Sequence, residues 1–112
     1  MILGPGNPRV FLYRGATDLR RGFDRLAAMV ESLLAQDPRS GALFVFVNRR
    51  RDRVKILAFE GDGYSIYYKR LEIGVYRLPE AAADRVEVSR AELAMLLEGI
   101  VPRQLDRRYN RT

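Results

Sequence analysis

Residues 44–57 read FVFVNRRRDRVKIL, an apolar run, then four arginines within five positions, then a second apolar run. The polar link between the two runs is too short to hold a crossover helix, so the pattern favours a β-hairpin. The arginines then lie at the tip of the hairpin, outside the sheet. We therefore expect Arg49, Arg50, Arg51 and Arg53 to project together from one end of the fold.

Three β-type runs follow one another in this part of the chain, at residues 43–47, 54–60 and 64–73. The second and third runs are separated by Glu60 to Gly63, in which Asp62-Gly63 is a strong hairpin turn because glycine accepts a positive φ. With both links this short, the three strands are predicted to form an antiparallel meander.

The residues before the meander predict a short strand and a helix. Residues 10–13 form a β-type run that Gly15 is expected to end, and Thr17 or Asp18 is expected to cap a helix that runs to Gln36. Gly22 would lie inside this helix at a cost of roughly 1 kcal/mol relative to alanine. Apolar residues recur at helical spacing along it: Leu19, Phe23, Leu26, Val30 and Leu33.

The residues after the meander predict another strand at 86–88 and a second helix. Ser89 and Glu92 have the spacing of a capping box, and Gly99 marks the end of the helix. Its apolar face consists of Leu93, Leu96, Leu97 and Ile100. The fold class is thus a single α+β domain over residues 1–101, a small antiparallel β-meander of three to five strands packed by two helices. Residues 102–112 are predicted to be a basic, flexible tail.

The strand at 43–47 is apolar at every position, so both faces of the sheet need a cover. Three covers are open at this point: the C-terminal helix, the N-terminal strand or another subunit. If the second face stayed open, it would favour a protein–protein interaction.

The composition excludes several kinds of catalytic and metal-binding site. The chain has 112 residues, a net charge of +6, eighteen arginines against two lysines, and neither histidine nor cysteine. Zinc sites, Ser-His-Asp triads and Cys-His pairs are therefore excluded. We expect no cofactor, no metal and no membrane span, and a reducing, cytoplasmic location. The excess of arginine favours a nucleic-acid partner, although codon bias in a GC-rich genome explains it equally well.

The candidate nucleic-acid-binding residues are basic side chains of the hairpin tip and of the strands beside it: Arg49, Arg50, Arg51, Arg53, Lys55, Lys69 and Arg70. Guanidinium groups on one loop repel each other, and contact with a polyanion relieves this repulsion. The alternative is a solvated turn in which Asp52 neutralises part of the charge.

Tyr67 and Tyr68 could stack on bases next to Lys69 and Arg70. Cross-strand packing explains these two tyrosines as well, and Arg20 and Arg21 suit a solvated helix face.

A metal-dependent nuclease is a further alternative, because close carboxylates can hold magnesium. Asp52 and Asp62 lie at opposite ends of the second strand, roughly 25 Å apart at about 3.3 Å per residue, and cannot share an ion. Glu60, Asp62 and Glu72 are nearer one another but lie among arginine, tyrosine and solvent. We therefore expect no enzymatic activity.

Several separate blocks of the sequence carry a resemblance to a known family: DLRRGFDRL, SGALFVFVNRRRDRVKIL, GDG, YYKRLEIGVY and ELAMLLEGI. In this order and spacing, over residues 9–101, they resemble the Orf2-type accessory protein, also called TnpB, of bacterial insertion sequences of the IS66 type. Family members often have tryptophan or another large aromatic in the region of Ala58-Phe59-Glu60, and this sequence departs from that pattern.

The resemblance implies a small basic accessory factor for transposition, with the strand-transfer chemistry attributed to a separate transposase. Together with the residues, it predicts a non-enzymatic protein that binds nucleic acid, DNA in the first place, through the arginine hairpin. The alternative is an adaptor that binds the transposase or another accessory subunit without touching nucleic acid. The expected partners are DNA, the element-encoded transposase and, as a further candidate, a second copy of the chain.

Overall fold

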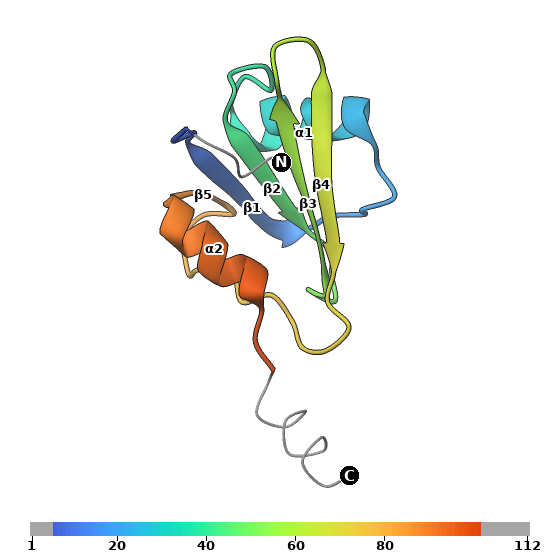
Figure 1. Cartoon of the computed structure of the whole chain (residues 1–112), viewed down its shortest axis with the longest axis vertical. Coiled ribbons are helices and arrows are strands. Elements are labelled where there is room, and N and C mark those ends of the chain that lie inside the picture. Colours follow the sequence, from blue (N-terminus) through green and yellow to red (C-terminus); the bar gives the residue numbers. More distant parts are fainter. Residues whose placement is uncertain (1–5, 102–112) are drawn as a thin grey trace, which may run out of the picture.

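A five-stranded sheet with one helix on each face makes up the computed structural model, which describes residues 6–101 (Figure 1). The elements follow one another as β1 (Val10–Ala16), α1 (Phe23–Leu34), β2 (Leu43–Val47), β3 (Arg53–Phe59), β4 (Tyr64–Arg70), β5 (Arg85–Val88) and α2 (Arg90–Glu98). The α+β class is confirmed. The predicted tail at residues 102–112 lies outside the described residues.

The predicted meander is present, and it forms one half of a larger sheet of order β4-β3-β2-β1-β5. The pairs β2–β3 and β3–β4 are antiparallel, with Phe44 opposite Leu57 and Lys55 opposite Tyr68. The strand β1 lies parallel to β2, and α1 makes the crossover between them. The strand β5 pairs antiparallel with the other side of β1 and forms one edge, and β4 forms the opposite edge.

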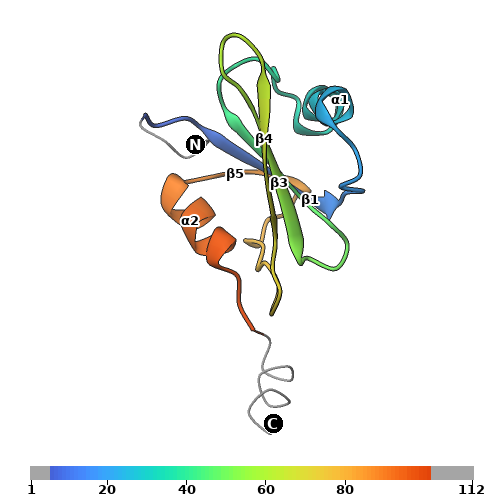
Figure 2. The same cartoon turned by 45° about the vertical axis from the view of Figure 1, so that its right-hand side comes forward.

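The helices α1 and α2 cover opposite faces of the sheet (Figure 2). On the α1 face, Phe44 and Phe46 pack with Leu26 and Val30 of the helix. The side chains that alternate with them, including Val45, face the α2 side. Since every residue of β2 is buried, the all-apolar sequence of this strand is explained by its two covered faces. The second face is thus covered by the helix α2, so residues 6–101 leave neither face of the sheet open.

The first helix starts later than the sequence predicted. Residues 18–21 form a turn instead, in which the amide of Arg21 donates to the carbonyl of Asp18 at 3.2 Å. The Asp18 carboxylate accepts from the backbone and guanidinium of Arg20, so it does not cap a helix. Gly22 is the N-cap of α1 rather than an interior residue, and the interior cost of a glycine does not apply.

The apolar stripe of α1 is only partly the predicted one. Leu26 and Val30 are buried, as expected. Leu19 is buried too, although it lies before the helix. Phe23 and Leu33 lie in the first and last turns and remain 49% and 38% exposed.

Two strand boundaries also differ from the sequence prediction. The strand β1 continues through Gly15 to Ala16, where a shift of register lets Ala16 pair with Val47 of β2. The strand β4 stops at Arg70, where the chain turns under the β2–β3 hairpin. No helix within residues 6–101 is long and apolar enough to cross a membrane.

The start and end of α2 follow the predicted signals. The hydroxyl of Ser89 accepts from the amide of Glu92 at 3.0 Å, and the Glu92 carboxylate accepts from the amide of Ser89 at 2.9 Å. Gly99, with φ of 70°, ends the helix and turns the chain away. Ile100 therefore lies beyond the helix, where it bridges to Val75 in the segment after β4.

Replacing Ser89 with alanine should lower the free energy of unfolding by about 1 kcal/mol, because the variant cannot form the capping hydrogen bond of α2. Chemical denaturation followed by circular dichroism measures the change. Ser32→Ala on the exposed side of α1 is the matched control and should stay within about 0.5 kcal/mol of the parent. Equal losses of stability in the two variants would contradict a specific role for the cap.

Candidate nucleic-acid interface

The loop between β2 and β3, together with the first residue of β3, forms residues 48–53, which we call the arginine loop, and it has a defined backbone. The amide of Arg51 donates to the carbonyl of Asn48 at 3.0 Å and closes a tight turn. The amide of Asn48 donates to the carbonyl of Arg53 at 3.2 Å, where the two strands begin to pair. Figure 1 shows this loop at the lower end of the sheet, beside the segment that follows β4.

The side chain of Asn48 holds the arginine loop together. Its Oδ1 accepts from the amides of Asp52 and Arg53 at 3.1 and 3.0 Å, and its Nδ2 donates to Asp52 Oδ1 at 2.7 Å. An amide side chain can both accept and donate, which is why asparagine suits this position. The carboxylate of Asp52 is thus engaged by an amide and not by a guanidinium.

The three arginines at the tip, Arg49, Arg50 and Arg51, are exposed to solvent. Within the described residues 6–101, no hydrogen bond or ion pair engages their guanidinium groups. Arg51 adopts a φ of 59°, a left-handed conformation that costs an arginine more than it costs a glycine. Arg51, the third arginine of the tip, therefore occupies a position whose backbone conformation favours glycine.

The segment after β4 supports the loop from below. The amide of Leu71 donates to the carbonyl of Asp52 at 2.7 Å, and the amide of Tyr76 donates to the carbonyl of Arg51 at 2.6 Å. Tyr76 is fully buried, and this burial raises the pKa of its phenol to about 12. These two hydrogen bonds fix the backbone carbonyls of Arg51 and Asp52 to the body of the domain. The arginine side chains therefore extend from a fixed backbone.

A groove of about 570 Å³ opens beside the arginine loop on the α1 face of the sheet, and we call it the basic groove. It is lined by Thr17, Asp18, Leu19, Arg20, Asn48, Arg49, Arg50, Arg53, Lys55 and Tyr68. The sequence candidates Arg49, Arg50, Arg53 and Lys55 are thus brought together around one concave surface. Arg51 lies on the same loop but does not line the groove.

Two further arginines near the groove already have acidic partners. Arg20 pairs with Asp18 at 2.7 Å, and this contact holds the pKa of Asp18 well below its usual range. Arg70 pairs with Glu72 at 2.7 Å, which raises the pKa of its guanidinium. Arg70 also lies directly opposite Arg53 in the β3–β4 register, and such a pair of like charges favours an anion between them.

The structure separates Lys69 from the other candidates. Alternation along β4 places Tyr68 and Arg70 on the α1 face, and Tyr67 and Lys69 on the α2 face. Tyr67 packs against the core there. The ammonium of Lys69 donates to the carbonyl of Leu97 at 3.0 Å, near the end of α2. Lys69 therefore serves the helix terminus and is not part of the basic groove.

Sequence reasoning missed two residues of this site. Asn48 belongs to the polar link between the two predicted strands, although an asparagine at the start of a hairpin loop is a known signal for side-chain bonds to the following amides. Thr17 is predicted from the sequence as a helix cap. It is instead only 4% exposed at the base of the groove, and its hydroxyl finds no hydrogen-bond partner among the described residues.

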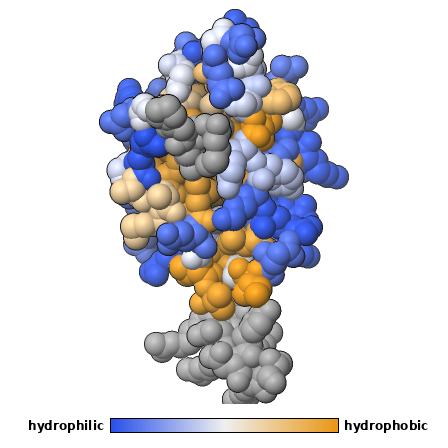
Figure 3. Space-filling model, in the orientation of Figure 1, coloured by the Kyte–Doolittle hydropathy of each residue, from blue (hydrophilic) through white to orange (hydrophobic). Residues whose placement is uncertain are grey.

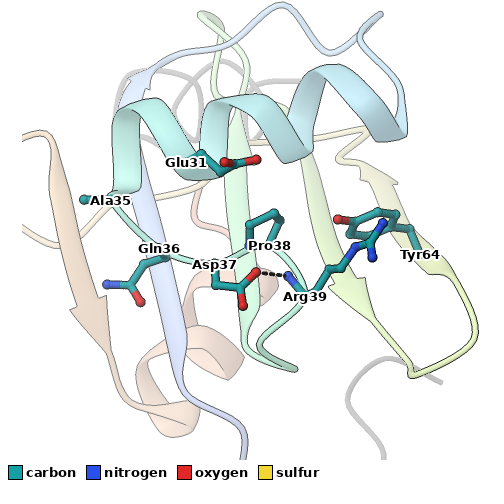
Figure 4. Close-up of a pocket in the computed structure, with 7 residues that line it drawn as sticks. All are labelled: Glu31, Ala35, Gln36, Asp37, Pro38, Arg39 and Tyr64. Atoms are coloured by element: carbon teal, nitrogen blue, oxygen red, sulfur yellow. Dashed lines mark hydrogen bonds between the residues drawn. The ribbon is translucent and has the colours of Figure 1, made fainter.

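A second groove, of about 630 Å³, lies at the opposite end of the sheet and has a different character (Figure 4). Its lining includes the carboxylates of Glu31 and Asp37 and the ring of Tyr64. Asp37 accepts from the amide of Arg39 at 2.9 Å. Among the described residues no three acidic side chains gather closely enough to hold a metal ion. This mixed surface does not favour a polyanion.

Comparisons with known proteins give one family. The model of a family described as "IS66 Orf2 like protein" matches residues 8–107. Two similar proteins come from Sinorhizobium fredii (strain NBRC 101917 / NGR234), and both are described as uncharacterized. The protein y4hO is 38% identical over 100 residues, which cover 89% of this chain and 87% of the relative. The protein y4jC is 32% identical over 100 residues, with coverage of 88% and 86%. No solved structure matches the chain.

Replacing Asn48 with alanine should lower the free energy of unfolding by about 2 kcal/mol, because the substitution removes three hydrogen bonds of the arginine loop at once. Guanidinium denaturation followed by circular dichroism measures the change. Asn7→Ala, at an exposed position before β1, is the control and should change the value by less than about 0.5 kcal/mol. An Asn48→Ala variant as stable as the parent would show that the loop does not depend on this side chain.

Proposed function

The chain belongs to the family of IS66 Orf2 like proteins, which ties it to insertion sequences, and we propose that it is a non-enzymatic accessory protein of transposition that binds DNA through the arginine loop. The observation that carries this proposal is the set of exposed guanidinium groups of Arg49, Arg50 and Arg51. In the described part of the chain these groups have no acidic partner.

The chemistry of the loop suits phosphate. A guanidinium group is planar and permanently charged, and its fork of N–H donors matches two phosphate oxygens. A cluster of such groups on a fixed backbone loses little conformational freedom on binding, and each phosphate contact releases counterions from the DNA. Asp52 is held by Asn48 and forms no ion pair among the described residues, and its single negative charge offsets only part of the positive charge of the four arginines around it.

The shape of the domain supports the same role. The arginine loop is the end of a hairpin whose strands are held in a five-stranded sheet, so the loop can approach a duplex without disturbing the core. The basic groove extends the positive surface along the α1 face to Arg53 and Lys55. A non-enzymatic role is supported by a sequence without histidine and cysteine.

A second candidate function, an adaptor for the transposase, is favoured by a different observation. Ile73, Ile100 and Val101 are 45%, 43% and 41% exposed. Ile73 and Ile100 come from segments that are bridged through Val75. Figure 3 shows an apolar surface at this end of the molecule. Size-exclusion chromatography with the transposase encoded by the same element tests this role: a shared peak that Ile73→Ser with Ile100→Ser removes would support it, and two unshifted peaks would oppose it.

The proposed DNA contact is tested by fluorescence anisotropy with a duplex from the element's end at salt concentrations from about 50 to 200 mM. The parent should bind with a steep salt dependence, and the triple variant R49S/R50S/R51S should bind more weakly. Its log–log salt slope should be shallower by about 0.9 for each phosphate that the variant no longer neutralises.

Arg39→Ser is the matched control, because Arg39 lies over Phe59 at the far end of β3 from the arginine loop. It removes one exposed arginine and should leave the slope nearly unchanged. Denaturation midpoints for every variant exclude unfolding as the cause. Failure of the parent to bind at low salt, or an equal salt slope in the parent and the triple variant, would contradict the proposal.

A further inference from the structure

Tyr68 is the aromatic residue of the basic groove, and it is unusually open for a strand tyrosine. It is 50% exposed, while its neighbour Tyr67 on the other face of β4 packs against the core. The strand β4 is an edge of the sheet, so no further strand lies beside it. Half of the surface of Tyr68 is therefore presented to solvent among the basic side chains that line the groove.

The ring of Tyr68 is held in place by the groove's cations. The ammonium of Lys55 lies 4.9 Å from the ring centroid and also donates to the carbonyl of Arg21 at 3.0 Å. The guanidinium of Arg53 donates to the Tyr68 hydroxyl at 3.4 Å. Lys55 thus covers one side of the ring and fixes its position, and the remainder of the ring stays available as a flat apolar surface.

The surrounding groups fit the other parts of a nucleotide. Arg49, Arg50 and Arg53 line the same groove and can contact phosphates on either side of a base lying on Tyr68. The groove volume of about 570 Å³ falls in the range of roughly 300–1,000 Å³ that is typical of sites for small organic groups.

From this arrangement we propose that the basic groove binds single-stranded DNA, with one unpaired base stacked on Tyr68 and the flanking phosphates held by the arginines. This inference rests on the proposed function, since it assigns a strand type to the same DNA-binding surface. A cationic groove with an exposed aromatic ring is the combination by which proteins hold single strands without reading their sequence.

The two parts of the surface have separable roles. In a duplex the faces of the bases are hidden by stacking, so a duplex can use the arginines but not the ring of Tyr68. An unpaired strand can use both. The arginine loop therefore contributes to both kinds of DNA, and Tyr68 contributes to the single strand alone.

The test compares a 12-nucleotide oligo-dT with a 12-base-pair duplex in anisotropy titrations of the parent, Tyr68→Leu and Tyr68→Phe. Tyr68→Leu should weaken single-strand binding by roughly 5- to 150-fold, which corresponds to the roughly 1–3 kcal/mol that one stacked base contributes. It should leave duplex binding within about twofold. Tyr68→Phe keeps the ring and should stay close to the parent on both ligands.

A second readout follows the stacking itself. A 2-aminopurine placed in the oligo-dT should lose emission when the parent or Tyr68→Phe binds, and should keep it with Tyr68→Leu at saturating protein. Equal losses of single-strand and duplex affinity in Tyr68→Leu, or no loss on either ligand, would overturn the inference while leaving the DNA-binding function intact. A parent chain that binds neither DNA would instead overturn the proposed function, so the two failures are distinct.

Discussion

The bond between the Asn48 amide and the Asp52 carboxylate, 2.7 Å long, is the interaction on which the candidate site depends. It joins the first and last parts of the arginine loop. Together with the hydrogen bonds that Asn48 Oδ1 accepts from two backbone amides, it sets the shape of the turn. It also engages the acidic side chain that lies among the arginines. The same interaction therefore orders the loop and holds its one carboxylate away from an ion pair with the arginines, which keep a net positive charge.

The rest of the fold explains why such a surface lies at an end of the sheet and not on a face. Both faces of the sheet are buried, one under α1 and the other under α2 with Tyr76 and Leu78. The open parts of the sheet are its ends and edges, among them the hairpin end, where the arginine loop rests on the segment after β4, and the adjoining edge at Tyr68. A domain of this size with two covered faces presents its charged groups through loops and edges.

The sequence predicted the β2–β3–β4 meander and the capped start of α2, because hairpin turns and capping boxes are local signals. It failed at the start of α1, where Asp18 pairs with Arg20 instead of capping a helix. The parallel β1–β2 pair and the cover supplied by α2 depend on contacts between distant segments, which no local pattern contains. Of the candidate cations, Lys69 lies apart because alternation on β4 turns it toward α2, and Arg70 has an acidic partner. Binding of DNA by the remaining cations is a prediction, and the sequence and the fold motivate it.

The central claim is that the arginine loop and the adjoining basic groove form the DNA-binding surface of this domain. An NMR titration of the ¹⁵N-labelled chain with element-end DNA locates that surface directly, residue by residue. The account predicts that the largest shifts fall on the amides of residues 48–53 and on Lys55, and that they fade as salt is raised. Shifts confined to α2 and β5, with the arginine loop unchanged, would contradict it.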